Sequence, residues 1–156
     1  SDISRVFRNA VLDLSEHHAF ARPLVNSGRL SMPCNYIGHS LTGEDALADG
    51  PARSQPGMPC PDAPLDNGYL LSKLGGWFTL MTLNTNAQSP QEIEGIEIAK
   101  LELSVTSNTT LAERFLGNAD RGVYLIRPDQ HIVARWSDYD AERVQKALAT
   151  ALGKTQ

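Results

Sequence analysis

The stretch Val123–Trp136, VYLIRPDQHIVARW, constrains the fold more than any other part of the chain. Two apolar runs, Val123–Ile126 and Ile132–Ala134, flank a short polar break. β-Branched and aromatic residues dominate the flanks, as is typical of strands. Within the break, Pro128 presets φ for a turn, and Asp129 can hydrogen-bond to the backbone just after it. The stretch therefore predicts a β-hairpin.

Strand and helix signals alternate between residues 77 and 153. Strands are predicted at Trp77–Leu83 and Glu97–Val105, ahead of the two hairpin strands. The predicted helices are a short one between the capping box Ser89-Pro90-Gln91-Glu92 and Gly95, then Thr109–Leu116, then Ala141–Leu152 with Asp140 as its cap. The order β-α-β-α-β-β-α indicates an α/β fold of the thioredoxin-like type. No C-x-x-C motif follows the first of these strands, so no dithiol redox site is expected.

The first twenty residues carry a helix signal. Ser4–Phe20 has one apolar stripe at helical spacing, and Ser4 can cap its N-terminus. The stripe consists of Val6, Phe7, Ala10, Val11 and Leu14. We expect its partner surface to lie upstream of Ser1. The absence of an initiator Met suggests a processed or cut piece of a longer polypeptide.

Residues 21–69 lack periodicity and are rich in proline and glycine. Apolar residues are nevertheless spread through them, so we expect an extended arm that packs along another surface. The next segment, Leu70–Leu74, fits either a short strand or a turn of helix. The predicted organisation is a helix over residues 1–20, an arm over 21–69 and a thioredoxin-like domain over 70–156.

Charge and composition exclude several classes of partner. The net charge is −4 and no basic stripe is present, which argues against nucleic acid. No apolar run approaches the ~20 residues of a membrane span. The two cysteines, Cys34 and Cys60, form no metal-binding or redox pair motif, so two free thiols in a cytoplasmic protein are the simplest interpretation. A redox switch between them is a weaker hypothesis.

Motifs for catalysis are missing from the sequence. There is no G-x-G-x-x-G, no phosphate-binding loop and no G-x-S-x-G elbow. Three charged residues bracket the hairpin: Arg127, Asp129 and Arg135. They could form an anion site or an ion-paired contact to a neighbouring domain. The favoured interpretation is that Asp129 caps its own turn and that the two arginines are solvated. His131 is expected to be a packed or surface residue. We expect Trp77 and Trp136 to be core or interface anchors, and we predict no catalytic, cofactor-binding or metal-binding residue.

Four strings, taken together and in order, identify a resemblance. They are Ser27–Pro33 with Tyr36 and Ser40, then Pro56–Leu65, then Leu70-Leu71 with Leu74–Leu80, and finally Val123–Trp136. In this order they resemble the C-terminal region of FAD-dependent aromatic-ring hydroxylases, specifically the 3-(3-hydroxyphenyl)propionate hydroxylase and phenol hydroxylase group. The resemblance covers nearly the whole chain.

The resemblance implies a thioredoxin-like C-terminal domain with a structural and assembly role, joined to an upstream flavin-binding domain and present in a homo-oligomer. Residues 1–20 would be the last helix of the flavin-binding part. Full-length members bind FAD, take electrons from NAD(P)H and hydroxylate a phenolic ring. The family's flavin-binding motifs are absent here, so none of its catalytic or FAD-binding residues maps onto this chain. The alternative is a free-standing thioredoxin-like binding module that docks a partner on residues 38–68.

Overall fold

The computed structural model describes residues 2–25 and 33–154, and the chain divides into two units at Pro33 and Cys34. The string Ser27–Met32 used for the resemblance lies outside the described residues. No helix in the described ranges is long and apolar enough to cross a membrane.

The N-terminal unit is helical. It contains helix α1 (Asp2–His17), the 3₁₀ turn η1 (Ala19–Ala21) and the short helix α2 (Arg22–Val25). The prediction of one helix over Ser4–Phe20 is wrong at both ends. Asp2 supplies a carboxylate in the first turn, where the helix dipole favours it, and Ser4 lies inside the helix rather than at its cap. His18 adopts an extended conformation, which ends α1 before Phe20.

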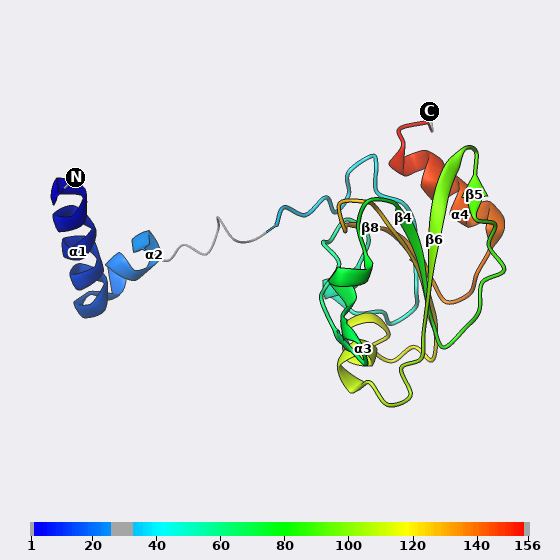
Figure 1. Cartoon of the computed structure of the whole chain (residues 1–156), viewed down its shortest axis with the longest axis horizontal. Coiled ribbons are helices and arrows are strands. Elements are labelled where there is room, and N and C mark those ends of the chain that lie inside the picture. Colours follow the sequence, from blue (N-terminus) through cyan, green and yellow to red (C-terminus); the bar gives the residue numbers. More distant parts are fainter. Residues whose placement is uncertain (1, 26–32, 155–156) are drawn as a thin grey trace. The chain divides into compact units, whose positions relative to one another are not determined.

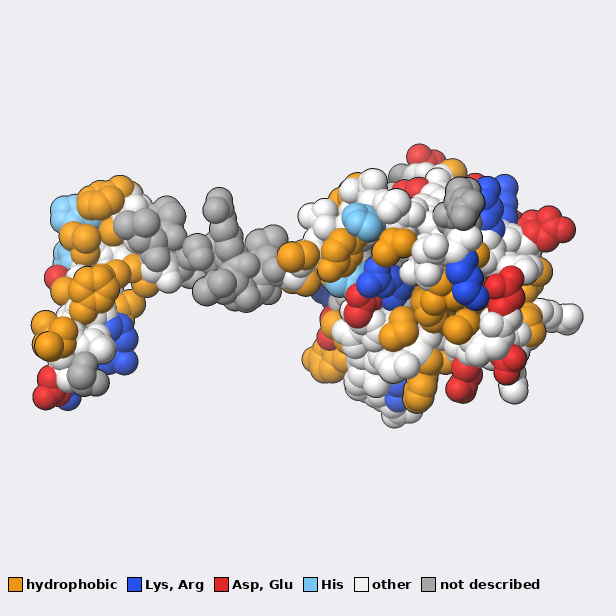
Figure 2. All heavy atoms as spheres, turned by 90° about the horizontal axis from the view of Figure 1, so that it is seen from above, with side chains coloured by type: hydrophobic (Ala, Val, Ile, Leu, Met, Phe, Trp, Pro, Cys, Tyr) orange, Lys and Arg blue, Asp and Glu red, His pale blue; other side chains and the backbone are white. Residues whose placement is uncertain are grey.

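The apolar stripe of α1 is not covered by the other residues of its own unit. No residue of α1 is buried, and Phe7 is 71% exposed. Hydrophobic side chains gather on the surface of this unit in Figure 2. The large exposed ones are Ile3, Val6, Phe7, Leu12, Leu14, Phe20 and Val25.

The second unit is built on a six-stranded mixed sheet (Figure 1). Its strands are β1 (Asp45–Ala46), β4 (Phe78–Leu83), β5 (Glu92–Ile93), β6 (Ile96–Leu103), β7 (Gly122–Ile126) and β8 (Ile132–Trp136), in the spatial order β1-β8-β7-β4-β6-β5. Strand β4 pairs in parallel with β6 and antiparallel with β7, and β7 pairs antiparallel with β8. The α/β class, the parallel pair and the β7–β8 hairpin are therefore confirmed. The thioredoxin-like type stays a prediction.

Helices cover the two faces of the sheet. Helix α3 (Thr109–Phe115) packs on one face with Met81, Leu83 and Tyr124. Helix α4 (Ala141–Ala151) packs on the other face with Leu80 and Leu125. Both helices are capped by a side-chain oxygen that accepts from the backbone N–H three residues later. The caps are Asn108 for α3 and Asp140 for α4. The predicted cap of the last helix is thus confirmed.

The short helix predicted between the first two strands is absent. In its place Glu92–Ile93 forms β5, which pairs antiparallel with the start of β6. Glu94 and Gly95 both have positive φ, 51° and 80°, as a two-residue hairpin turn requires. The Ser89 hydroxyl donates to the carbonyl of Pro90 at 3.0 Å rather than capping a helix. The observed order is therefore β-β-β-α-β-β-α, not β-α-β-α-β-β-α.

Residues 34–69 belong to the same compact unit as the sheet. They contain β1, the 3₁₀ turn η2 (Ala52–Ser54) and the small hairpin β2 (Pro64–Leu65) and β3 (Gly68–Tyr69). Strand β1 pairs in parallel with β8 and extends the sheet. For Leu70–Leu74 the sequence fitted either a short strand or a turn of helix. The structure has a helical turn there, the 3₁₀ turn η3 over Leu70–Lys73.

Close backbone approaches hold this segment against the rest of the unit. The N–H of Tyr36 donates to the carbonyl of Gly57 at 2.7 Å, and the N–H of Gly57 donates to that of Ile132 at 2.8 Å. Gly57 has φ +89°, and a Cβ there would lie 2.5 Å from the backbone of Tyr36. Only glycine fits this position without displacing the backbone.

Candidate functional site: the two ends of the β7–β8 hairpin

The turn of the hairpin is closed by its own backbone and side chains. The N–H of Arg127 donates to the carbonyl of His131 at 2.8 Å, and the N–H of Gln130 donates to that of Arg127 at 2.9 Å. Asp129 accepts from the N–H of His131 at 3.3 Å and pairs with the Arg127 guanidinium at 2.6 Å. Gln130 has φ 67°, the left-handed conformation of this turn. The predicted role of Asp129 in its own turn agrees with this geometry.

Side chains of the turn bind two distant segments. Gln130 Nε2 donates to the carbonyls of Leu71 and Leu74, at 3.1 and 3.3 Å. His131 Nε2 lies 2.9 Å from the carbonyl oxygen of Cys34 and therefore carries the hydrogen. The ring of His131 also contacts that of Tyr36, with 4.9 Å between the ring centres and a tilt of 58° between the planes. His131 is a packed residue, and the turn fastens both ends of the 34–74 segment.

Arg127 completes an aromatic–cationic surface around Tyr36. Its guanidinium carbon lies 5.5 Å from the centre of the Tyr36 ring, within the range of a cation–π contact. The same guanidinium is already paired with Asp129. Since its charge is neutralised by its neighbour, Arg127 is a poor site for an external anion.

Arg135, at the other end of the hairpin, is buried and only 4% exposed. Its guanidinium forms a bidentate pair with Asp45, with Nε at 2.6 Å from Oδ1 and Nη2 at 2.9 Å from Oδ2. Nη1 donates to the carbonyl of Pro51 at 2.7 Å and to the hydroxyl of Ser54 at 3.2 Å. The favoured prediction of two solvated arginines is wrong for Arg135. No sequence signal marked its partners, because Asp45 is 90 residues away.

Electrostatics at this end follow from burial. Burial alone would lower the pKa of Arg135, but the hydrogen bonds to Asp45 and the neighbouring Tyr124 raise it overall. Burial raises the pKa of Tyr124. The Tyr124 hydroxyl donates to the carbonyl of Phe115. Arg135 therefore stays charged, Tyr124 stays neutral, and the cluster links the segment 45–54 to strands β7 and β8.

The two tryptophans differ in burial. Trp136 is 1% exposed, and its Nε1 donates to Glu44 at 2.8 Å, so it is a core anchor that also holds the arm. Trp77 is 50% exposed. The core alternative is therefore wrong for Trp77, which precedes β4 and follows two glycines with positive φ, and the interface alternative stays a prediction.

Both cysteines are free thiols. Cys34 is exposed and Cys60 is buried. Burial, together with the nearby charge of Asp62, raises the pKa of the Cys60 thiol. Cys60 is therefore held as the unreactive neutral thiol.

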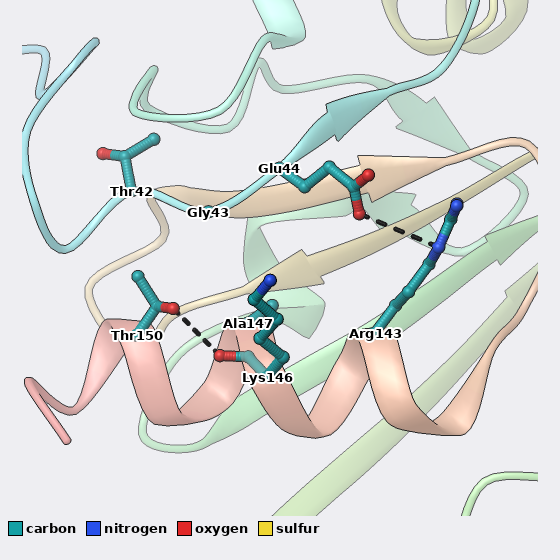
Figure 3. Close-up of a pocket in the computed structure, with 7 residues that line it drawn as sticks. All are labelled: Thr42, Gly43, Glu44, Arg143, Lys146, Ala147 and Thr150. Atoms are coloured by element: carbon teal, nitrogen blue, oxygen red, sulfur yellow. Dashed lines mark hydrogen bonds and ion pairs between the residues drawn. The ribbon is translucent and has the colours of Figure 1, made fainter. Parts of the chain in front are cut away.

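An open groove of about 450 Å³ lies between the arm and α4 (Figure 3). Glu44 and Arg143 reach toward one another across it, with 3.9 Å between Oε2 and Nε. Lys146 extends from α4 into the same groove (Figure 3). The remaining lining residues are Thr42, Gly43, Ala147 and Thr150. This lining offers charges for binding but no paired nucleophile and base.

The helix N-termini of the second unit are occupied by capping side chains. The N-termini of α3 and α4, which could otherwise hold a pyrophosphate, are occupied by the side chains of Asn108 and Asp140, and the latter is itself an anion. Within residues 2–25 and 33–154, no three His, Cys, Asp or Glu side chains come together to hold a metal.

No protein-family model matches the sequence, and no curated protein is significantly similar to it. Solved structures that share this fold include flavin-dependent enzymes. The flavin-dependent monooxygenase PieE, solved with FAD and substrate, has a TM-score of 0.64 at 24% identity over 88% of this chain. K252c-soaked RebC has a TM-score of 0.59 at 16% identity over 97% of this chain. Aklavinone-11 hydroxylase, solved with FAD and aklavinone, has a TM-score of 0.54 at 20% identity over 78%.

The match is to a part of each of these proteins. The chain spans 29% of PieE, 28% of RebC and 26% of aklavinone-11 hydroxylase. At these identities the likeness establishes a shared fold. The resemblance to FAD-dependent hydroxylases predicted from the sequence is thus confirmed at the level of the fold, and the share covered is consistent with a C-terminal domain.

Proposed function

We propose that this chain is the C-terminal structural and assembly domain of an FAD- and NAD(P)H-dependent monooxygenase that hydroxylates a phenolic ring. One observation carries the proposal: nearly the whole chain shares its fold with about a quarter of several flavin monooxygenases. The chain itself does not catalyse. Its work is to stabilise a flavin-binding domain that precedes it in a cytoplasmic enzyme.

The exposed stripe of α1 supports this role. Val6 and Phe7 are 65% and 71% exposed, although burying a large apolar side chain contributes roughly 1.5–3 kcal/mol. The flavin-binding domain is the partner that covers this stripe. Packing against this domain would stabilise α1, which has no buried residue of its own.

The gene tests the proposal directly. We expect the coding sequence upstream of Ser1 to encode a flavin-binding domain with a G-x-G-x-x-G motif. A start codon immediately before Ser1, with no such domain, would overturn the proposal.

A second test uses paired charge insertions in the full-length enzyme. Phe7→Glu places a carboxylate on the apolar stripe, and Asn9→Glu places the same group on an exposed polar position of α1. We expect Phe7→Glu to lower the thermal midpoint of flavin release by several degrees and Asn9→Glu to leave it unchanged. Equal effects of the two variants would contradict a buried stripe.

The alternative of a free-standing module that docks a partner on residues 38–68 has less support. That segment is engaged within its own unit: Asp45 pairs with Arg135, the N–H of Cys60 donates to Gln130, and the N–H of Leu70 donates to Ala63. An arm held in this way is not free to receive a partner.

A further inference from the structure

Strand β6 leaves part of one edge of the sheet unpaired. On its inner side, Ile98–Leu103 pairs along its whole length with β4. On its outer side, β5 pairs only with Ile96 and Glu97, and the N–H of Ile98 then donates to the carbonyl of Gln91 at 2.8 Å. In the described part of the chain, no strand follows along the outer side from Ala99 to Leu103.

The direction of each backbone group on β6 follows from two hydrogen bonds. Leu103 accepts from the N–H of Asn84, at the end of β4, so its groups face inward. Ile98 donates to Gln91, so its groups face outward. Because the N–H and C=O of one strand residue share an edge and alternate along the strand, Lys100 and Glu102 point theirs outward. Four strong hydrogen-bonding groups therefore line an open edge.

We propose that this edge is a docking strand for a second copy of the same chain. The two β6 strands pair antiparallel about a two-fold axis at Leu101, joining two six-stranded sheets into one. Lys100 and Glu102 of one copy exchange backbone hydrogen bonds with Glu102 and Lys100 of the other. The proposal does not depend on the proposed function, because it needs only the residues of this unit.

Charge selects this register. Centred on Leu101, the pairing places the ammonium of Lys100 opposite the carboxylate of Glu102 in the second copy, twice per dimer. Centring on Lys100 would oppose two lysines, and centring on Glu102 would oppose two glutamates. Opposite charges in cross-strand pairs are favourable and like charges are unfavourable. The sequence of the edge is thus self-complementary, as a two-fold interface requires.

The apolar face of the edge agrees with the same register. Ala99, Leu101 and Leu103 are partly buried, and the two leucines pack against the core on the α3 side. The pairing would place Leu101 against Leu101 and Ala99 against Leu103 of the second copy. The opposite edge of the sheet is β1, which has only two residues and cannot offer a comparable ladder.

Charge reversal tests the register. Lys100→Glu opposes two glutamates and Glu102→Lys opposes two lysines, while the double variant K100E/E102K restores opposite charges. All three changes lie at exposed side chains. In sedimentation velocity of the 156-residue chain, we expect the wild type to form a concentration-dependent dimer. Each single variant should weaken the dimer by on the order of tenfold, and the double variant should recover it.

Two controls separate this interface from association through α1. In the first, Phe7→Glu should leave the dimer in place. In the second, amide hydrogen exchange at Lys100 and Glu102 should slow as the protein concentration rises, whereas exchange at Ala99 and Leu101 should not change. A wild type that stays monomeric at millimolar concentration would overturn the proposal. Single variants that dimerise as strongly as the wild type would also overturn it. The same holds for a dimer that Phe7→Glu abolishes and Lys100→Glu leaves unchanged.

Discussion

Arg127 and Arg135 belong to the same hairpin and have opposite roles. Arg127 pairs with Asp129, two residues away, on the surface of the turn. Arg135 pairs with Asp45, 90 residues away, and is buried with carbonyl and hydroxyl acceptors around it. The first pair shapes a turn that the local sequence already favours. The second holds a distant segment in place, and its loss would leave polar groups buried without partners.

The comparison is tested most strongly by removing the buried guanidinium. Arg135→Ala should lower the free energy of unfolding by about 3 kcal/mol, because Asp45, Ser54 and the carbonyl of Pro51 lose their donor. Urea denaturation followed by circular dichroism measures the change. Arg135→Lys should recover only part of it, since an ammonium cannot make the bidentate contact. A loss below 1 kcal/mol for Arg135→Ala would show that the pair is not structural.

Alkaline pH should lower the free energy of unfolding, because a buried neutral group lies near each end of the hairpin. The backbone N–H of Cys60 donates to the carbonyl of Gln130 behind the turn, and Tyr124 lies beside Arg135. Burial raises the pKa of the Cys60 thiol and that of the Tyr124 hydroxyl. As pH rises through the ordinary thiol value of about 9, the unfolded chain loses the Cys60 proton while the folded chain keeps it. Stability therefore falls as pH rises, by up to about 1.4 kcal/mol per pH unit for one group.

Urea unfolding between neutral pH and about pH 10 checks this slope. Cys60→Ala should flatten it, and Cys34→Ala, at an exposed thiol, should leave it as it is. An unchanged slope in Cys60→Ala would show that the buried thiol does not titrate differently in the folded state.

The smallest effect is expected at the turn. Arg127→Ala should cost no more than about 0.5 kcal/mol, because an ion pair near the solvent contributes little. It also loses the contact with the Tyr36 ring. The same urea experiment applies, with Arg135→Ala as the reference. A cost equal to that of Arg135→Ala would erase the distinction between the two ends.

Local patterns predicted most of the sheet unit. The two apolar runs around the polar break in Val123–Trp136, the apolar run Trp77–Leu83 and the Asp140 cap each specify an element within a short window. All three elements are present. The helix expected at Pro90 failed because Glu94 and Gly95 favour a two-residue hairpin turn that competes with the capping box. Both signals lie within the same few residues, and pairing with β6 decides between them.

The contacts that define the site could not be predicted in this way. Asp45 with Arg135, Glu44 with Trp136, and Gln130 with Leu71 join residues 59 to 92 positions apart. Nothing in the spacing of these residues distinguishes them from surface residues of the same kind. Burial of Arg135 depends on the segment 45–54, whose place is set only when the whole unit is assembled.

The parallel pairing of β1 with β8 has a consequence for how this chain is made. Asp45 and Ala46 leave the ribosome long before Arg135 and Trp136, to which they must bind. Closing so long a loop is slow, and chains are synthesised from the N-terminus. The segment that carries Asp45 therefore stays unpaired until Trp136 has been synthesised. Until then the parallel β1–β8 pair cannot form, and the sheet of this unit stays incomplete.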